Sequence, residues 1–189
     1  MNKLFEGKAA VTVSAIWFLV FILSCRTEIE SVLCSRGINV IGKEYYRYFT
    51  AGLVHTNLIH TLGNIYIILW IGSKYENSIG SLRFYCIGFI GSAICYLLFS
   101  LIYENAASSI GGSGFWYVIA GYVFMQQVFV PEFPKSGQMW LILYVSVFLS
   151  ISAPSVRSMI LIPTKSALVF HMVAIVLGVC MGIVSRGIQ

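Results

Sequence analysis

A serine at the start of an apolar stretch and the few histidines of the chain are the residues whose types could do chemistry. Ser113 lies in the turn GGSG at residues 111–114, directly before a hydrophobic segment. The chain has only three histidines, His55, His60 and His171. A serine hydroxyl attacks a carbonyl when a neighbouring base accepts its proton, and imidazole is the side chain that most often does so. Ser113 with a histidine therefore predicts hydrolysis through a serine nucleophile.

The third member that usually orients the histidine base has no obvious candidate. That member is normally a carboxylate, but the chain has no aspartate, and its seven glutamates all lie outside the apolar segments. We therefore expect a catalytic pair, with Ser113 as nucleophile and His171 as base. Tyr117 lies four residues after Ser113, so on a helix it shares a face with the serine, and its ring could stack on His171.

Serine hydrolysis also needs hydrogen-bond donors for the negatively charged oxygen of the intermediate. His60 and Asn64 are four residues apart near the start of one apolar segment, so a helix would place both side chains on one face. We expect these two side chains, together with the backbone N–H of Ser113, to form the oxyanion site.

The segments that must position these residues are long and apolar. Of the 189 residues, 58% are hydrophobic and only 10% are charged, against roughly 25% charged in a soluble domain. The mean hydropathy is +0.85. Six candidate membrane spans lie at about 9–25, 57–73, 83–103, 112–130, 138–153 and 166–185. This pattern predicts an all-α, multi-pass membrane protein that forms one domain over residues 1–189, with its core at about 9–185.

Alternation of the spans across the membrane places the starts of the second, fourth and sixth spans on one side. Those starts carry His60 with Asn64, then Ser113, then His171, so these side chains can meet at one depth. The distribution of Lys and Arg outside the long first connection favours a cytoplasmic N-terminus. The net charge of +5 is spread over loops and ends, which indicates topology and contact with lipid headgroups rather than nucleic-acid binding.

The longest connection, residues 26–56, mixes charges, aromatic residues and glycines. It is too long for a turn and too aromatic for a free linker, so we expect a folded element at the membrane surface. Cys25 and Cys34 flank its start and could pair in an oxidising compartment, but the odd number of cysteines leaves this open. The other cysteines, which lie in apolar segments and are expected to be buried, are Cys86, Cys95 and Cys180.

Together these residues resemble the rhomboid family of intramembrane serine proteases over nearly the whole six-span core. The matching positions are Tyr46-Arg47 (the family usually has Trp-Arg), His55, His60 and Asn64 as H-x4-H-x3-N, Tyr75-Glu76 with Gly80-Ser81, Gly111-x-Ser113-Gly114 with Tyr117 and Gly121, and His171 with Ala174, Gly178 and Gly182. The chain departs from the family pattern at Phe170, where alanine is usual, and at Ala174, where glycine is usual.

The resemblance implies a six-transmembrane-helix bundle with a long structured first loop and a cavity open to the outside. It implies a Ser113–His171 dyad, an oxyanion site at His60 and Asn64, and a supporting hydrogen-bonding role for His55. The implied activity is that of a serine endopeptidase without cofactor or metal that cleaves transmembrane segments of single-span proteins. Its implied partners are those substrates and membrane lipid, and we expect it in the bacterial inner membrane. The sequence does not reveal an oligomeric state.

Other interpretations of the same residues stay open at this stage. A lone G-x-S-G turn is more often a place of close helix packing than of catalysis. Three histidines could bind zinc, although the chain has neither an H-E-x-x-H pattern nor a carboxylate near them. The strongest alternative outside the enzymes is a weakly active or inactive rhomboid-like protein that binds or chaperones transmembrane clients. The lack of aspartate excludes an intramembrane aspartyl protease.

Overall fold

The computed structural model describes residues 7–141, 144 and 165–186, and in these ranges the chain is helical without a named strand. The longer helices are α1 (Lys8–Ser24), α4 (Leu58–Ile71), α6 (Ser81–Ile102), α7 (Ser113–Phe129) and α10 (Lys165–Arg186). The shorter elements are α2 (Ile29–Leu33), α3 (Arg47–Thr50), α5 (Asn77–Ile79), the 3-10 turn η2 (Ala51–Leu53) and the π-helical turn η3 (Gly72–Glu76). The all-α prediction is confirmed for the described residues.

The longer helices coincide with five of the predicted spans, and their ends lie within a few residues of the predicted ones. Among the described helices, the two that are long and apolar enough to cross a membrane are α6 and α10, and α1 is a shorter apolar helix. The predicted span at 138–153 lies largely outside the described residues, of which 137–141 are helical. The number of spans therefore stays a prediction.

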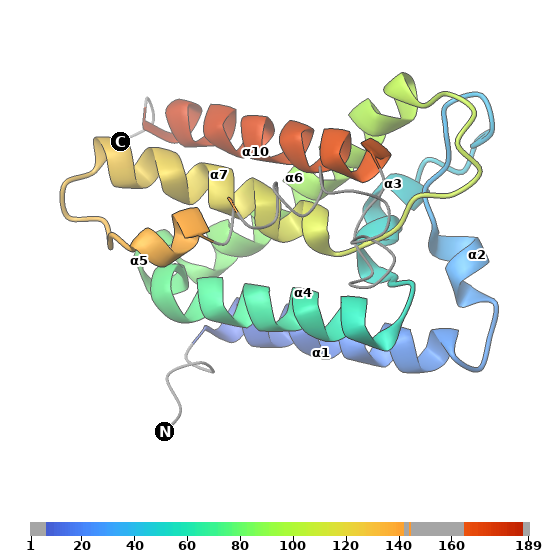
Figure 1. Cartoon of the computed structure of the whole chain (residues 1–189), viewed down its shortest axis with the longest axis horizontal. Coiled ribbons are helices and arrows are strands. Elements are labelled where there is room, and N and C mark those ends of the chain that lie inside the picture. Colours follow the sequence, from blue (N-terminus) through green and yellow to red (C-terminus); the bar gives the residue numbers. More distant parts are fainter. Residues whose placement is uncertain (1–6, 142–143, 145–164, 187–189) are drawn as a thin grey trace.

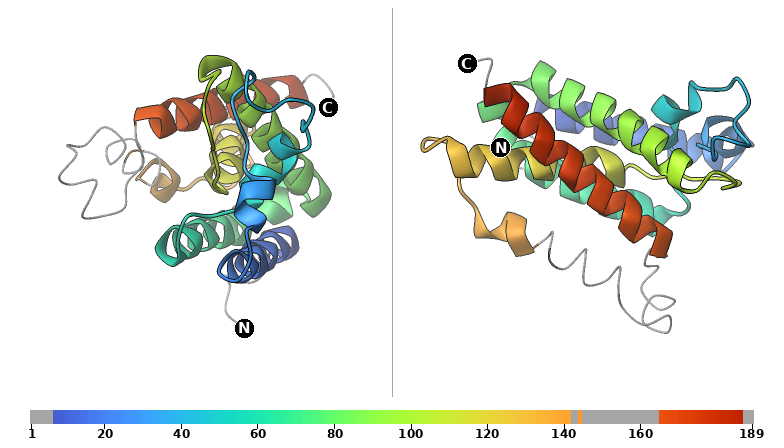
Figure 2. Two further views of the ribbon diagram at one scale, coloured as in Figure 1. Left: turned by 90° about the vertical axis from the view of Figure 1, so that its right-hand side faces the viewer. Right: turned by 90° about the horizontal axis from the view of Figure 1, so that it is seen from above.

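Helix α7 lies at the centre of the bundle (Figure 1). α10 packs along it on one side, while α4 and α1 lie side by side on the other; the view from above in Figure 2 shows α10 crossing over α7 and α6. Nearly every side chain of α7 from Ser113 to Gln126 is buried. A helix that is apolar on all its faces belongs in the interior of a bundle, and this places Ser113 next to several helices at once.

Glycines allow α7 and α10 to approach closely. A methyl group on Gly178 would collide with the backbone carbonyl of Val118, and a methyl group on Gly121 would collide with the carbonyl of Ile175. Helices come this close only where side chains are small. The face of α10 that carries Gly178 therefore meets α7, as the spacing of small residues predicts.

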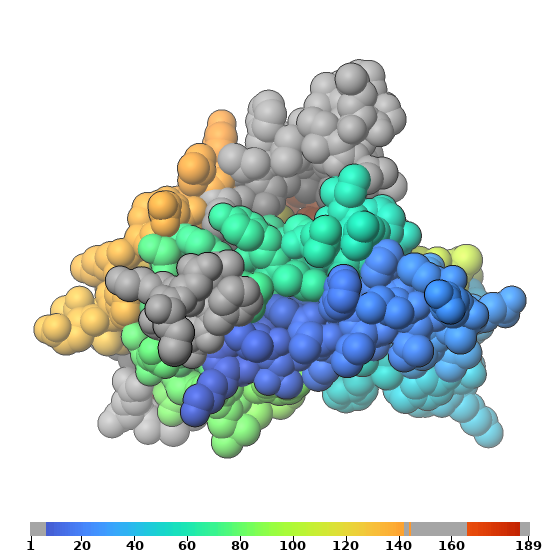
Figure 3. Space-filling view, turned by 90° about the horizontal axis from the view of Figure 1, so that it is seen from below, coloured from blue at the N-terminus to red at the C-terminus, as the bar shows by residue number. Residues whose placement is uncertain are grey.

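The outer surface of the bundle carries large apolar side chains. Figure 3 shows α1 and α4 covering one face together. α1 exposes Phe18 and Leu19, and α4 exposes Leu62 and Tyr66. Lipid tails are as apolar as leucine, so such side chains need no protein partner in a membrane. This surface fits contact with lipid.

The cysteines correct one expectation from the sequence. All five thiols are free, so the structure holds no Cys25–Cys34 disulfide. Cys95 is buried as predicted, but the prediction was wrong for Cys86 and Cys180, which are exposed. The reason is that an apolar membrane segment predicts contact with an apolar medium, and that medium can be lipid as well as protein.

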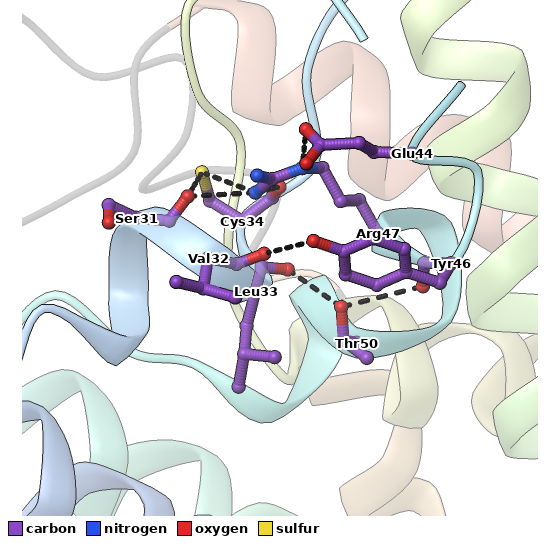
Figure 4. A network of polar contacts seen from close by, with 8 residues as sticks. All are labelled: Ser31, Val32, Leu33, Cys34, Glu44, Tyr46, Arg47 and Thr50. Carbon is purple, nitrogen blue, oxygen red and sulfur yellow. Dashed lines mark hydrogen bonds and ion pairs between the residues drawn. The ribbon is translucent and has the colours of Figure 1, made fainter. Parts of the chain in front are cut away.

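The connection between α1 and α4 is organised around Arg47 (Figure 4). This buried guanidinium donates to the backbone carbonyls of Ser31 at 2.8 Å and Cys34 at 3.1 Å, and its Nε pairs with Glu44 at 2.8 Å. The hydrogen bond from Arg47 holds the pKa of the Glu44 carboxyl below its ordinary value. Because the carbonyls belong to the end of α2 and Arg47 begins α3, these bonds fix the two short helices to each other.

The same connection is hydrogen-bonded to the loop that leads into α7. Ser35 and Ser109 form an isolated antiparallel bridge, with N···O distances of 2.9 and 2.8 Å. Further along, the N–H of Gly111 donates to the carbonyl of Ala51 at 3.2 Å. The residues just before Ser113 are therefore held by the first connection of the chain.

Glu76 is a buried carboxylate at the end of the π-helical turn η3, only 1% exposed. Its oxygens accept hydrogen bonds from the backbone N–H groups of Ala9 at 2.8 Å and Ala10 at 3.0 Å, and from the hydroxyl of Ser81 at 2.6 Å. A helix N-terminus carries unpaired N–H groups and partial positive charge, so a carboxylate there is stabilising. Glu76 thus joins the first turn of α1 to the connection between α4 and α6.

Candidate active site

Ser113 is the first residue of α7, and the turn before it is held from several sides. Gly111 has φ of 133°, a conformation that favours glycine because it has no Cβ. The carbonyl of Gly111 accepts a hydrogen bond from the Tyr96 hydroxyl at 2.9 Å. The N–H of Gly112 donates to His55 Nε2 at 3.2 Å. These two bonds hold the carbonyl and the N–H of the peptide group between Gly111 and Gly112, just before Ser113.

Ser113 and His171 meet across the contact between α7 and α10. The distance from His171 Nε2 to Ser113 Oγ is 3.1 Å, which is within hydrogen-bond range. Ser113 is 9% exposed and His171 is 7% exposed. The other ring nitrogen of His171, Nδ1, is buried and makes no hydrogen bond within the described part of the chain. No carboxylate therefore orients this imidazole there.

The orientation of His171 comes from an aromatic stack instead. The Tyr117 ring lies against the imidazole with ring centroids 4.2 Å apart and an angle of 24° between the planes. Trp116 in turn stacks on Tyr117, with ring centroids 3.7 Å apart and an angle of 26° between the planes. The spacing of Tyr117 from Ser113 explains the first contact, because residues four apart share a helix face.

Asn64 and His60 approach the same region from α4. Asn64 is 4% exposed; its Oδ1 accepts a hydrogen bond from Trp116 Nε1 at 2.7 Å, and its Nδ2 donates to the carbonyl of His60 at 3.0 Å. A methyl group on Gly111 would lie 3.2 Å from Cε1 of the His60 ring and 3.8 Å from Ser113 Oγ. The His60 ring and the serine hydroxyl therefore flank the same point of the turn.

His55 lies behind the turn, between two other aromatic rings. Its ring centroid is 5.3 Å from that of Trp17 and 5.3 Å from that of His60, both in edge-on arrangements. Burial and, to a smaller extent, the neighbouring His60 lower the pKa of His55 to about 3, so the ring is neutral at ordinary pH. A neutral imidazole nitrogen can accept the N–H of Gly112, which fits the supporting role expected from the sequence.

Sequence reasoning missed two side chains of this site, Trp116 and Tyr96. Both carry a polar group on a large ring, and such groups usually find a hydrogen-bond partner when buried. This rule could have predicted that each ring forms a hydrogen bond. It could not have predicted the partners, Asn64 and the carbonyl of Gly111, because these lie 52 and 15 residues away along the chain.

Phe170, one of the two positions at which the chain departs from the family pattern, fills the space beside Gly114. A methyl group on Gly114 would lie 2.8 Å from Cζ of the Phe170 ring. The ring also packs on Tyr96 and Phe99 of α6, with centroids 4.8 and 5.6 Å apart. The larger side chain fits because its neighbour on α7 is a glycine.

The electrostatics of the site follow from its residue types. The described side chains gathered around Ser113 and His171 carry amide, hydroxyl, indole and imidazole groups. Among the described residues, no group of three or more His, Cys, Asp or Glu side chains could hold a metal ion. The arrangement supplies a hydroxyl in contact with an imidazole, and further N–H donors beside them, which are the components of acyl transfer through a serine.

The fold and these contacts define a class of protein. It is an apolar helical bundle in which a serine and a histidine from adjoining helices share a buried hydrogen bond. The family model of the Rhomboid domain matches residues 42–188, which is most of the chain. The chain belongs to the rhomboid family.

One relative adds to this finding. The chain is similar to Rhomboid protease GlpG of Haemophilus influenzae, with 25% identity over 124 residues. The match covers 64% of this chain and 64% of that relative. Family membership and this relative point to an integral membrane protein.

Proposed function

We propose that this protein is an intramembrane serine endopeptidase, with Ser113 as nucleophile and His171 as general base. The observation that carries the proposal is the 3.1 Å contact between His171 Nε2 and Ser113 Oγ at the start of a buried helix. Membership of the rhomboid family and the name of the GlpG relative agree with it. The substrates would be transmembrane segments of single-span membrane proteins, cleaved by one domain that comprises residues 1–189.

The proposed reaction has two halves. Ser113 Oγ attacks the carbonyl carbon of the scissile bond while its proton passes to His171 Nε2, and the imidazolium then gives that proton to the leaving amine. A water molecule next attacks the acyl-enzyme ester and loses a proton to His171; the acyl C–Oγ bond then breaks, the imidazolium returns that proton to Ser113 Oγ, and the product with its new carboxyl end leaves. Tyr117 would hold the imidazole in place through both halves by the stacking contact.

The oxyanion of each tetrahedral intermediate would be stabilised at the N-terminus of α7. The N–H of Ser113 belongs to the first turn of that helix, where N–H groups have no partner within the helix. The side chains of His60 and Asn64 would supply further donors from α4. The partial positive charge of the helix N-terminus adds to the attraction.

A transmembrane substrate would have to unwind before it reacts. The peptide bonds of a helix are hydrogen-bonded and enclosed by side chains, so their carbonyl carbons are not open to attack. We therefore propose substrates that contain residues of low helix propensity near the cleaved bond. We further propose that the protein acts in the bacterial inner membrane, in contact with lipid on its apolar outer surface.

A serine-directed fluorophosphonate tests this function directly. In detergent or liposomes, the wild-type protein should be labelled, and Ser113→Ala should abolish labelling because the attacked oxygen is gone. His171→Ala should reduce the labelling rate strongly while leaving the thermal unfolding of the protein near wild type. Equal labelling of the wild type and Ser113→Ala would contradict the proposal.

A further inference from the structure

A buried hydrogen bond joins Trp116 and Asn64, and in it the indole N–H must be the donor and the amide the acceptor. Trp116 is 3% exposed and Asn64 is 4% exposed. The bond joins α7 to α4 over 2.7 Å, from the indole Nε1 to the amide oxygen Oδ1. An indole N–H can donate and cannot accept, whereas an amide has one end of each kind.

The indole therefore favours one orientation of the Asn64 amide, the same one that the carbonyl of His60 favours. If the amide were turned over, its NH2 group would meet the indole N–H, and two donors would face each other in a buried place. In the orientation found, Oδ1 meets the indole and the amide nitrogen lies on the other side, where one hydrogen is donated to the carbonyl of His60 at 3.0 Å. The second hydrogen of that nitrogen has no acceptor among the residues that the structure describes, and can serve another group.

We infer that Trp116 is a positioning residue for the oxyanion donor Asn64: it holds the amide so that an N–H is directed to the developing negative charge. The inference rests on the proposed function and goes one step beyond it. Trp116 touches neither Ser113 nor the scissile bond in this scheme. It acts through Asn64 alone.

The position of Trp116 gives this contact a second consequence. It lies three residues after Ser113 on the same helix, and its ring stacks on Tyr117, which in turn stacks on His171. The donor on α4 and the base on α10 are thus both set by neighbouring rings of α7. A displacement of the indole reaches the donor through a hydrogen bond and reaches the base only through stacking.

These two routes can be separated by substitutions that keep a ring but remove the donor. Trp116→Phe keeps an aromatic surface against Tyr117 and removes the N–H. Replacement of Trp116 by 3-benzothienylalanine keeps the full bicyclic shape and exchanges only the N–H for sulfur. In both, the oxygen of Asn64 loses its partner, and a buried unpaired amide turns to find another.

The expected result is a loss of turnover without a loss of binding. For cleavage of a fluorogenic transmembrane peptide, kcat should fall about tenfold or more, while KM stays within about twofold, because the oxyanion exists only after attack. Trp70→Phe is the matched control: it makes the same chemical change in α4 near the other end of the bundle, and should leave both constants unchanged.

A double-mutant comparison makes the inference specific to Asn64. In an Asn64→Ala background, Trp116→Phe should cause no further loss, because the donor that it positions is already gone. A second fall of the same size in that background would overturn the positioning role. So would wild-type kcat in the benzothienylalanine protein.

A readout that does not depend on activity separates this inference from the proposed function. The side-chain amide signals of Asn64 in an NMR spectrum, assigned by their loss in Asn64→Ala, should shift in the benzothienylalanine protein and stay in place in Trp70→Phe. Unchanged signals would overturn the inference. Shifted signals in a protein that shows no Ser113-dependent cleavage would support the Trp116 contact while contradicting the protease function.

Discussion

At the scale of single residues, the proposed catalytic pair of Ser113 and His171 has no carboxylate bonded to the imidazole among the described residues. In three-residue catalytic sites, an acid fixes the tautomer and the direction of the histidine. Here the Nδ1 atom of His171 is buried without a hydrogen bond among the described residues, and the ring is held by stacking on Tyr117. Packing can fix the plane of the imidazole, and the contact with Ser113 then fixes which nitrogen faces the nucleophile.

The first prediction concerns this pair. Ser113→Ala and His171→Ala should each reduce cleavage of a transmembrane substrate to background, and the double variant should be no worse than either alone. The reason is that the two side chains perform one proton transfer together, so their contributions are not additive. Initial rates in liposomes give the measurement. Cleavage near the wild-type rate in either single variant would remove the pair from the mechanism.

The second prediction concerns the oxyanion donors. His60→Ala and Asn64→Ala should lower kcat more than they change KM, because these donors act on a charge that develops during the reaction. Loss of one such donor costs about 10²–10³ in rate in a soluble serine protease, and we expect a comparable or smaller loss in a wet membrane site. Steady-state kinetics decide the matter: full turnover in both variants would assign His60 and Asn64 to structure alone.

At the scale of helices, close approach between α7 and α10 brings His171, the proposed base, to Ser113. Gly178 lies on α10 two turns after His171, and its α-carbon faces the backbone of α7 near Val118. The glycine touches no reacting atom. It allows the two helix axes to lie close enough for the 3.1 Å contact between His171 Nε2 and Ser113 Oγ.

The third prediction follows from this approach. Gly178→Leu should reduce turnover at least about tenfold, since a side chain at that position collides with the α7 backbone and a misplacement worth ~1.4 kcal/mol suffices for that loss. Gly137→Leu is the control, because no atom of the described residues lies within 4 Å of the Cβ position at Gly137. The two variants are compared by their cleavage rates, measured on purified proteins at equal concentration. Normal turnover in Gly178→Leu would separate this contact from catalysis.

The fourth prediction concerns the joint at Glu76. Glu76→Ala should lower the free energy of unfolding by about 1.5–3 kcal/mol, because it leaves buried donors at the start of α1 without a charged acceptor. Ser81→Ala, which removes one of the three hydrogen bonds, should cost less. Thermal unfolding in detergent measures both. A Glu76→Ala protein with wild-type stability would show that the first turn of α1 finds other partners.

The sequence predicted these elements better than it predicted their contacts. The ends of α6 and α7 were predictable because apolar length is a strong signal. Which apolar residues face lipid was not, as Cys86 and Cys180 show, because hydrophobicity does not distinguish a lipid tail from a protein side chain. The partner of Trp116 was hidden for a different reason: a hydrogen bond between residues 52 positions apart exists only once two helices have packed.

At the scale of the whole molecule, the candidate site is assembled from distant parts of the chain around one helix. α7 carries the proposed nucleophile, α10 the proposed base, and α4 the proposed donors, while the connection after α1 holds the turn before Ser113. Each contact with Ser113 thus depends on packing between elements that are remote in sequence. The site therefore forms only when the bundle closes, which is one physical reason why an isolated motif in the sequence says little about activity.

Among the described residues, no carboxylate, ammonium or guanidinium group is hydrogen-bonded to Ser113 or His171, and this has an electrical consequence. A membrane potential does work only on charge that moves through it, and that work is about 2.3 kcal/mol per elementary charge over 100 mV. In the proposed transfer a proton would pass between two atoms that are 3.1 Å apart, and this upper limit on its path is about a tenth of a ~30 Å hydrocarbon core, so the field would contribute at most ~0.2 kcal/mol. Turnover in vesicles that hold a potassium diffusion potential should therefore change by less than about twofold when the voltage is reversed. An energised membrane and a depolarised one would present the same catalyst, and a larger voltage dependence would mean that a charged group elsewhere in the protein moves during each cycle.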